Sequence, residues 1–379
     1  MTRTRETLGT FEDIRDAAVR ATGLSDFGGD EHEEGLRILV DDLAGPAGLT
    51  PLGNYLQRAQ VRSALVGRLV AQAGFAAHPS YVDVPVERPV FVTGLPRTGT
   101  TALHRLLTAD PRHQGLELWL TEVPQPRPPR DTWDSDPVFT GLQQAYSSHH
   151  VENPEFMGIH YMDAGSVEEC WRVLRQSGKS IGFESLAYVP TYSSWLAKQD
   201  WTDAYARHRA NLQLIGLHDT DRRWVLKNPS HLVALDALMA VYPDALVVQT
   251  HRDPVVAVAS ACSLSAEATR GWSTVFEGEV VGRTQLELLS RSVATFAEAR
   301  ARYPQAQFVD VEYDAFVADP VGTVRGIYEA FDLGWTDEVA TEVERLDAES
   351  RQGGRRPSHR YDLADYGLTP AEVRAAFAG

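Results

Sequence analysis

Apolar residues in the first quarter of the chain recur at helical spacing. Between residues 10 and about 76 they return every three or four positions, which places them on one face of a helix. The pattern predicts three helices, and Thr10 followed by Asp13 resembles a capping box at the start of the first. We therefore expect residues 1–85 to form a helical N-terminal extension that packs on the domain that follows. The positions with this spacing are Phe11, Ile14, Ala18 and Val19, then Leu36, Leu39, Val40 and Leu43, and then Leu56, Val61, Leu65, Val66, Leu69 and Val70.

The spacing changes after this extension, where short apolar runs without alternation appear. Such runs occur near Phe91 and at residues 224–226, 245–250 and 308–311. An unbroken run of this length indicates a strand that is buried on both faces of a parallel sheet. A helical pattern follows each run. We therefore predict the α/β class, with a P-loop-like parallel sheet flanked by helices in residues 86–379.

Residues from about 131 to 218 interrupt this alternation with a helical pattern that is rich in aromatic residues. We predict a helical insertion here and expect it to face the acceptor pocket, because pockets are apolar with a few placed polar groups. Most of these aromatic side chains are nevertheless expected in the core. Ser166 followed by Glu169 is a second capping signal, which predicts that a helix begins there.

A glycine-containing turn joins the first predicted strand to its helix. Gly94 and Gly99 let the backbone turn tightly and approach a ligand, and the N–H groups of such a turn suit a phosphate. The spacing is Gly-x4-Gly-Thr-Thr, so Thr100 stands where an ATP-binding loop has lysine. Arg97 offers a different cation, whose planar fork can bind phosphate oxygens in bidentate fashion. The alternative is an ordinary turn that binds nothing, which the flanking strand and Arg97 disfavour.

Polar residues also follow the other predicted strands. Lys227, Arg252 and Tyr313 each lie at or just beyond the end of one run. Lys227 is one of only three lysines in the chain. Ligands of parallel sheets bind beyond the carboxyl ends of the strands. Together with the glycine turn, these residues predict one site for an anionic ligand.

The charge of the chain limits which partners fit. Its 379 residues include 36 basic and 52 acidic residues, for a net charge of −16. This balance argues against nucleic acid as a partner, because such binding needs a basic surface. The two cysteines form no disulfide framework and indicate a reducing cytoplasm. We expect neither a signal peptide nor a membrane span, since no apolar run is long enough.

These motifs resemble those of PAPS-dependent sulfotransferases, where PAPS is 3′-phosphoadenosine 5′-phosphosulfate. The resemblance covers roughly residues 89–367 and is to a bacterial branch with a Leu-Pro-Arg-Thr-Gly-Thr-Thr loop, distantly similar to tyrosylprotein sulfotransferases. It implies that residues 96–101 bind the 5′-phosphosulfate and that Arg252 and Ser260 bind the 3′-phosphate, with Tyr313 beside it. The cofactor-binding residues that it implies are Arg97, Thr98, Gly99, Thr100, Thr101, Arg252, Ser260 and Tyr313.

The same resemblance implies catalytic roles. Lys227 would stabilise the charge that grows on the bridging oxygen as the sulfur–oxygen bond breaks. Glu117 matches the family's general base approximately, with a shift of one residue. Other sulfotransferases use histidine, so His160 is the second candidate for the base and Glu122 the third. The choice among these three stays open.

The predicted function is the transfer of a sulfuryl group from PAPS to a hydroxyl of a small-molecule acceptor, aromatic or lipid-like, with release of PAP. No metal is implied, because the lysine and Mg²⁺-linked features of ATP loops are absent. The alternatives are an ATP-dependent P-loop kinase and a non-catalytic nucleotide-binding protein. Oligomeric state is open, with a homodimer among the options. The basic, glycine-rich residues 353–361 either fold over the cofactor or form a mobile tail.

Overall fold

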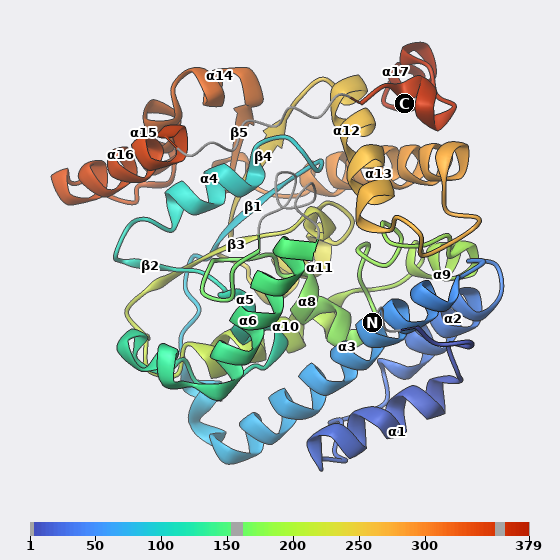
Figure 1. Ribbon diagram of the computed structural model, residues 1–379. Coiled ribbons are helices and arrows are strands. Elements are labelled where there is room, and N and C mark those ends of the chain that lie inside the picture. The colour runs from blue at the N-terminus through green and yellow to red at the C-terminus, as the bar shows by residue number, and fades with distance from the viewer. Residues whose placement is uncertain (1–3, 153–161, 353–360, 379) are drawn as a thin grey trace.

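A five-stranded parallel sheet forms the centre of the protein (Figure 1). The computed structural model describes residues 4–152, 162–352 and 361–378. The strand order is β2-β3-β1-β4-β5, so the predicted α/β fold is confirmed. The strands are β1 Val90–Gly94, β2 His113–Gln114, β3 Arg223–Lys227, β4 Leu246–His251 and β5 Phe308–Glu312. The edge strand β2 was not predicted, because two residues are too short to carry a pattern.

Strand β1 is buried along its whole length, which explains its unbroken apolar run. Val90 and Val92 pack into a cluster with Leu103 of the helix α4. Phe91 points to the opposite face and belongs to the larger core cluster. The helices of the first face are α4 Thr100–Leu107, α14 Tyr313–Ala318, α15 Pro320–Phe331 and α16 Asp337–Gln352.

The N-terminal helices pack directly into the larger core. Their bounds are α1 Phe11–Thr22, α2 Glu33–Ala44 and α3 Pro51–Ala77. The capping box of Thr10 and Asp13 is confirmed, with hydrogen bonds in both directions. Buried apolar residues of all three helices share one cluster with residues of β1, β3 and β4. The division of the chain into residues 1–85 and 86–379 stays a prediction. The shared core includes residues from both sides of this boundary.

Helices also cover the second face of the sheet (Figure 1). The helical pattern that follows residues 224–226 is divided in the structure into a 3₁₀ turn, Pro229–Leu232, and an α-helix, Leu235–Val241. Among the described residues, no helix is both long enough and apolar enough to span a membrane. The further α-helices are α5 Leu118–Glu122, α6 Pro137–Glu152, α8 Trp171–Leu174, α9 Pro190–Leu196, α10 Thr202–Ile215, α11 Leu235–Val241, α12 Pro254–Ala268, α13 Gly278–Arg300 and α17 Pro370–Ala376. The 3₁₀ helices are η1 Pro79–Asp83, η2 Arg130–Ser135, η3 Arg175–Ser177, η4 Pro229–Leu232, η5 Gln305–Gln307 and η6 Leu363–Tyr366.

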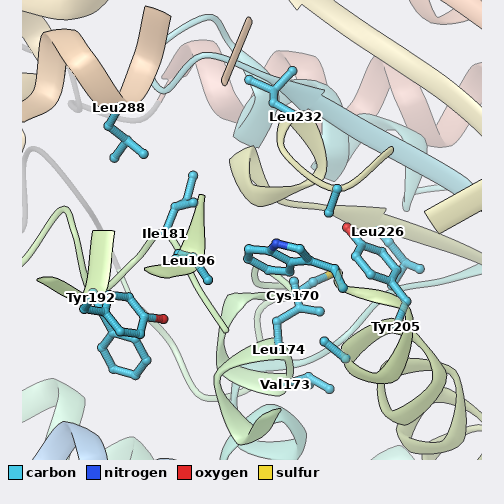
Figure 2. Packing of buried hydrophobic residues seen from close by; sticks show 14 of the residues in the cluster. Cys170, Val173, Leu174, Ile181, Tyr192, Leu196, Tyr205, Leu226, Leu232 and Leu288 are labelled. Carbon is cyan, nitrogen blue, oxygen red and sulfur yellow. The ribbon is translucent and has the colours of Figure 1, made fainter. Parts of the chain in front are cut away.

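The aromatic insertion contributes core, as the sequence indicated for most of its aromatic residues. Figure 2 shows Tyr205 of α10 beside Leu226 of β3, with Cys170 close to both. Tyr192 lies in the same cluster further from the sheet. The segment that precedes α8 is therefore packed against the strand that ends at Lys227.

Two buried histidines pack against Phe91 of β1 and hydrogen-bond to tyrosines. His208 of α10 bonds through Nδ1 to the Tyr242 hydroxyl at 2.8 Å. The His231 Nδ1 atom lies 2.6 Å from the Tyr205 hydroxyl. Burial lowers the pKa of His208 to about 3, so this ring is neutral in the folded protein at neutral pH.

His208 gives a testable pH dependence of stability. Between pH 6.5 and about 3 the unfolded chain binds a proton at His208 and the folded protein does not, so stability falls as the pH decreases. Urea unfolding at pH 7 and pH 5 should show that His208→Gln loses about 1–2 kcal/mol less between these two pH values than the wild type. The exposed His218 supplies the control. If His208→Gln and His218→Gln show the same pH dependence, the explanation is wrong.

Candidate active site

The loop between β1 and α4 has three residues in the left-handed region. The φ angles are 146° at Gly94, 71° at Arg97 and 86° at Gly99. A Cβ on Gly94 would lie 2.2 Å from the Thr250 Oγ1 atom, and one on Gly99 would lie 3.2 Å from the Phe316 ring. Glycine is therefore required at position 94, and at position 99 any other residue would be strained. The positive φ at Arg97 is strained for a non-glycine residue, as is common where a backbone encloses a ligand.

Hydrogen bonds hold the loop against β4 and leave its helix end open. The Thr98 hydroxyl donates to the Leu95 carbonyl at 2.7 Å and lies 2.5 Å from the Thr250 hydroxyl. Gly99 is the N-cap of α4, and no side chain caps that end. The first N–H groups of α4, beginning at Thr100, are thus presented to an anion.

The residues expected to bind the other phosphate lie against this loop. Arg252 donates through Nη1 to the Arg97 carbonyl at 2.8 Å, and its guanidinium lies 3.9 Å from the centre of the Tyr313 ring. The Arg97 Nε atom donates to the Ser260 hydroxyl at 3.2 Å. The structure therefore brings together four residues that are spread over more than 200 positions of the sequence.

Lys227 lies at the end of β3, which is the neighbour of β1 in the sheet. The register pairs Val92 with Lys227, so the lysine lies beside the loop. Its side chain is 1% exposed, and Nζ donates to the Thr101 hydroxyl at 3.2 Å and to the Glu169 carboxylate at 2.5 Å. Glu169 is 23% exposed. The pair consists of a buried cation and a carboxylate that solvent or a ligand can reach.

Glu117 binds an arginine of the Pro-rich loop. Its carboxylate lies 3.1 Å from the Arg127 guanidinium, which also donates to the Gln114 side chain at 2.6 Å and to Asp219 at 2.6 Å. Burial raises the pKa of Glu117, and the charge of Arg127 opposes this shift. Its ion pair is thus with Arg127 and not with Lys227.

Glu122 is enclosed by two arginines. It contacts Arg172 and Arg175. Burial would raise the pKa of Glu122, but Arg175 and Arg172 outweigh burial and lower that pKa to about 2. Such a carboxylate is a weak base, since it holds a proton only in strong acid. The remaining candidate for the base, His160, lies outside the described residues.

A comparison with known protein families identifies the chain. Residues 89–337 match the model of the sulfotransferase family, and this span is more than half of the sequence. The chain belongs to the sulfotransferase family. The fold and the family that the sequence motifs predicted are both confirmed.

Solved structures and curated proteins add relatives of this sulfotransferase. The crystal structure of sulfotransferase STF1 from Mycobacterium tuberculosis H37Rv is 51% identical, with a TM-score of 0.92, and the match covers 99% of this chain and 100% of that one. Sulfotransferase STF9 from Mycobacterium avium is 30% identical, with a TM-score of 0.88, over 97% and 95% of the two chains. Omega-hydroxy-beta-dihydromenaquinone-9 sulfotransferase Stf3, from Mycobacterium bovis and Mycobacterium tuberculosis, is 24% identical over 272 residues. That match covers 66% of this chain and 64% of the relative, so the chain spans less than two thirds of the curated relatives' length.

The contact between Glu169 and Lys227 has no signal in the sequence. The helix start predicted from Ser166 and Glu169 is wrong, because α8 begins only at Trp171 and no side chain caps it. The Glu169 carboxylate binds Lys227 instead, 58 positions along the chain. No local pattern marks such a contact.

Replacing Gly99 tests the geometry of the loop in this sulfotransferase. Gly99→Ala should lower the free energy of unfolding by about 1–2 kcal/mol, because alanine at this φ is strained and its Cβ crowds the Tyr313 and Phe316 rings. Gly141 lies within α6 with open space around it, so Gly141→Ala should be neutral or stabilising. Urea unfolding of both variants measures the difference. Equal stabilities of Gly99→Ala and the wild type would contradict the strain.

Proposed function

We propose that this enzyme transfers a sulfuryl group from PAPS to an acceptor hydroxyl and releases PAP. One observation carries the proposal: Arg97 of the loop is hydrogen-bonded to both Arg252 and Ser260, at 2.8 and 3.2 Å. Two cationic groups at adjoining strand ends suit a nucleotide with an anionic group at both its 5′ and its 3′ position. ATP lacks the 3′-phosphate, and Thr100 stands in place of the lysine that ATP-binding loops use.

The donor-binding roles follow the chemistry of the two groups. The N–H groups of the loop and the start of α4 would hold the 5′-phosphosulfate, together with Arg97. Arg252 and Ser260 would hold the 3′-phosphate, and Tyr313 supports Arg252, whose guanidinium lies over its ring. The proposed donor-binding set is Arg97, Thr98, Gly99, Thr100, Thr101, Arg252, Ser260 and Tyr313.

Lys227 is suited to stabilise the leaving group. Its Nζ atom lies 3.2 Å from the Thr101 hydroxyl, on the first turn of the helix that faces the 5′ group. A bond forms from the acceptor oxygen to sulfur as the bond from sulfur to the 5′-phosphate oxygen breaks, and negative charge grows on that phosphate oxygen. A buried ammonium beside it stabilises the charge more than water does.

We propose Glu169 as the general base that takes the proton of the acceptor hydroxyl. Its carboxylate lies 2.5 Å from Lys227 Nζ and is partly exposed, so a bound acceptor can reach it. Glu117 and His160 stay candidates from the sequence. Glu117 and Glu169 each pair with a cation, but the Glu117 side chain is 12% exposed and the Glu169 side chain is 23% exposed. The greater exposure of Glu169 and its position beside Lys227 favour it as the base.

The acceptor class is proposed from the name of one relative together with the sequence. Stf3 is named for omega-hydroxy-beta-dihydromenaquinone-9, a compound whose name includes a hydroxyl group. The sequence predicted an aromatic or lipid-like acceptor. We therefore propose a hydroxyl on an apolar carrier, for which geraniol is a small primary alcohol probe and p-nitrophenol a phenolic one.

Calorimetry with PAP and ATP tests the donor. PAP should bind much more tightly than ATP, and Arg252→Ala should weaken PAP binding about 10- to 100-fold, because a charge-assisted hydrogen bond is lost. Arg325→Ala is the control, since Arg325 also lies over an aromatic ring, that of Trp335, but on α15. ATP binding as tight as that of PAP, or an unchanged affinity for PAP in Arg252→Ala, would contradict the proposed donor site and favour the alternative of an ATP-dependent kinase.

Release of PAP from PAPS with geraniol or p-nitrophenol tests the base. Glu169→Gln should lower kcat about 100-fold or more and leave PAP affinity nearly unchanged, because glutamine cannot accept the proton. Glu117→Gln should have a much smaller effect on kcat. A large loss in Glu117→Gln with a small loss in Glu169→Gln would reverse the assignment.

A further inference from the structure

A buried charge cluster lies beside the proposed base. Glu122 ends α5, and its Oε2 atom lies 2.9 Å from the Arg175 guanidinium. Arg172 contacts the other carboxylate oxygen. The side chains of Glu122, Arg172 and Arg175 are 12%, 11% and 1% exposed. Both oxygens of Glu122 are therefore occupied, and its charge neutralises one of two buried cations.

Helix α3 of the N-terminal extension closes this cluster. Arg175 donates to the Gln60 side-chain carbonyl at 2.7 Å and to the Ser63 hydroxyl at 2.8 Å. The Ser63 hydroxyl in turn bonds to Glu122. Each arginine also lies over the Trp171 ring, 4.7 Å away for Arg172 and 4.8 Å for Arg175. The two guanidinium groups are thus fixed on several sides.

The cluster and the proposed base belong to one short segment. The Cys170 N–H donates to the Lys227 carbonyl at 3.0 Å, and Glu169 directly before it binds the Lys227 side chain. Helix α8 has only four residues, which is too short to be stable by its own hydrogen bonds. Residues 169–175 are therefore held at one end by β3 and at the other by Glu122.

We propose that Glu122 is a positioning residue for the sulfuryl transfer. By binding Arg172 and Arg175, it fixes the segment that carries Glu169 and so holds the Glu169 carboxylate against Lys227. This inference rests on the proposed function, and it gives Glu122 a role other than the base that the sequence suggested. A displacement of about 1 Å at a reacting group costs about 100-fold in rate, so the anchor matters for catalysis.

A double-mutant cycle tests this role. Glu122→Gln should lower kcat about 10- to 100-fold with PAP affinity unchanged. If Glu122 acts through Glu169, the variant with both substitutions should lose no more activity than Glu169→Gln alone. Equal loss from Glu122→Gln in both backgrounds, or a lower Tm with normal kcat, would overturn the proposal.

Two further variants serve as controls for stability. Glu184 is also a buried carboxylate, 5% exposed and 2.9 Å from Arg291, but it lies outside this segment. Glu184→Gln removes a matched ion pair and should leave kcat unchanged. Glu122→Asp keeps the charge and should recover part of the rate, which also distinguishes positioning from unfolding.

Lysine NMR provides a readout that needs no acceptor. The chain has only Lys179, Lys198 and Lys227, so ¹³C-labelled lysine gives three assignable Cε signals. Glu169→Gln and Glu122→Gln should both move the Lys227 signal, and Glu184→Gln should not. An unmoved signal in Glu122→Gln overturns the positioning role. If the Lys227 signal moves in both variants but the wild type does not turn over PAPS, the positioning contact stands and the proposed function is contradicted.

Discussion

The pairing of β1 with strands on both sides is the constraint on which the site depends. Val92 pairs with Lys227 of β3, and Gly94 pairs with Thr250 of β4. Because all strands run parallel, their polar ends meet at one edge of the sheet. The glycine loop can approach β4 only without a Cβ, since one on Gly94 would lie 2.2 Å from the Thr250 hydroxyl. The register of β1 and β4 thus places Arg97 and Arg252, which follow these strands, beside each other.

A second constraint is the cost of burying charge in a chain with a net charge of −16. The site needs cations, and each buried cation needs a partner to offset its lost hydration. Lys227 has Glu169, and the pair Arg172 and Arg175 shares Glu122. The two carboxylates therefore suit different proposed roles. A ligand can reach Glu169, whereas Glu122 is enclosed by its two arginines.

The sequence predicted that the loop after β1, Arg252 and Tyr313 lie together, because each directly follows a strand. The run in β1 is buried on both faces and reads as an unbroken apolar stretch, and the loop glycines, Arg97 and Arg252 follow strands directly. The contacts of Glu169 and Glu117 could not be predicted in this way. Glu169 reaches Lys227 only through the fold of the insertion, Glu117 is held by Arg127 of the Pro-rich loop, and the two-residue strand β2 has no pattern to find.

This difference follows from how the two groups of residues are placed. Arg97, Arg252 and Tyr313 belong to strand–loop–helix units that are each continuous in sequence, so their spacing carries their geometry. Around Glu169, α3, α5 and α8 are joined through one charge cluster, which consists of Ser63 of α3, Glu122 of α5, Arg172 of α8 and the following Arg175. The N-terminal helices share the core of the sheet, and α3 also contributes Gln60 and Ser63 to the charge cluster. The predicted boundary near residue 85 follows the change of pattern along the chain, whereas these contacts join the two parts on either side of it.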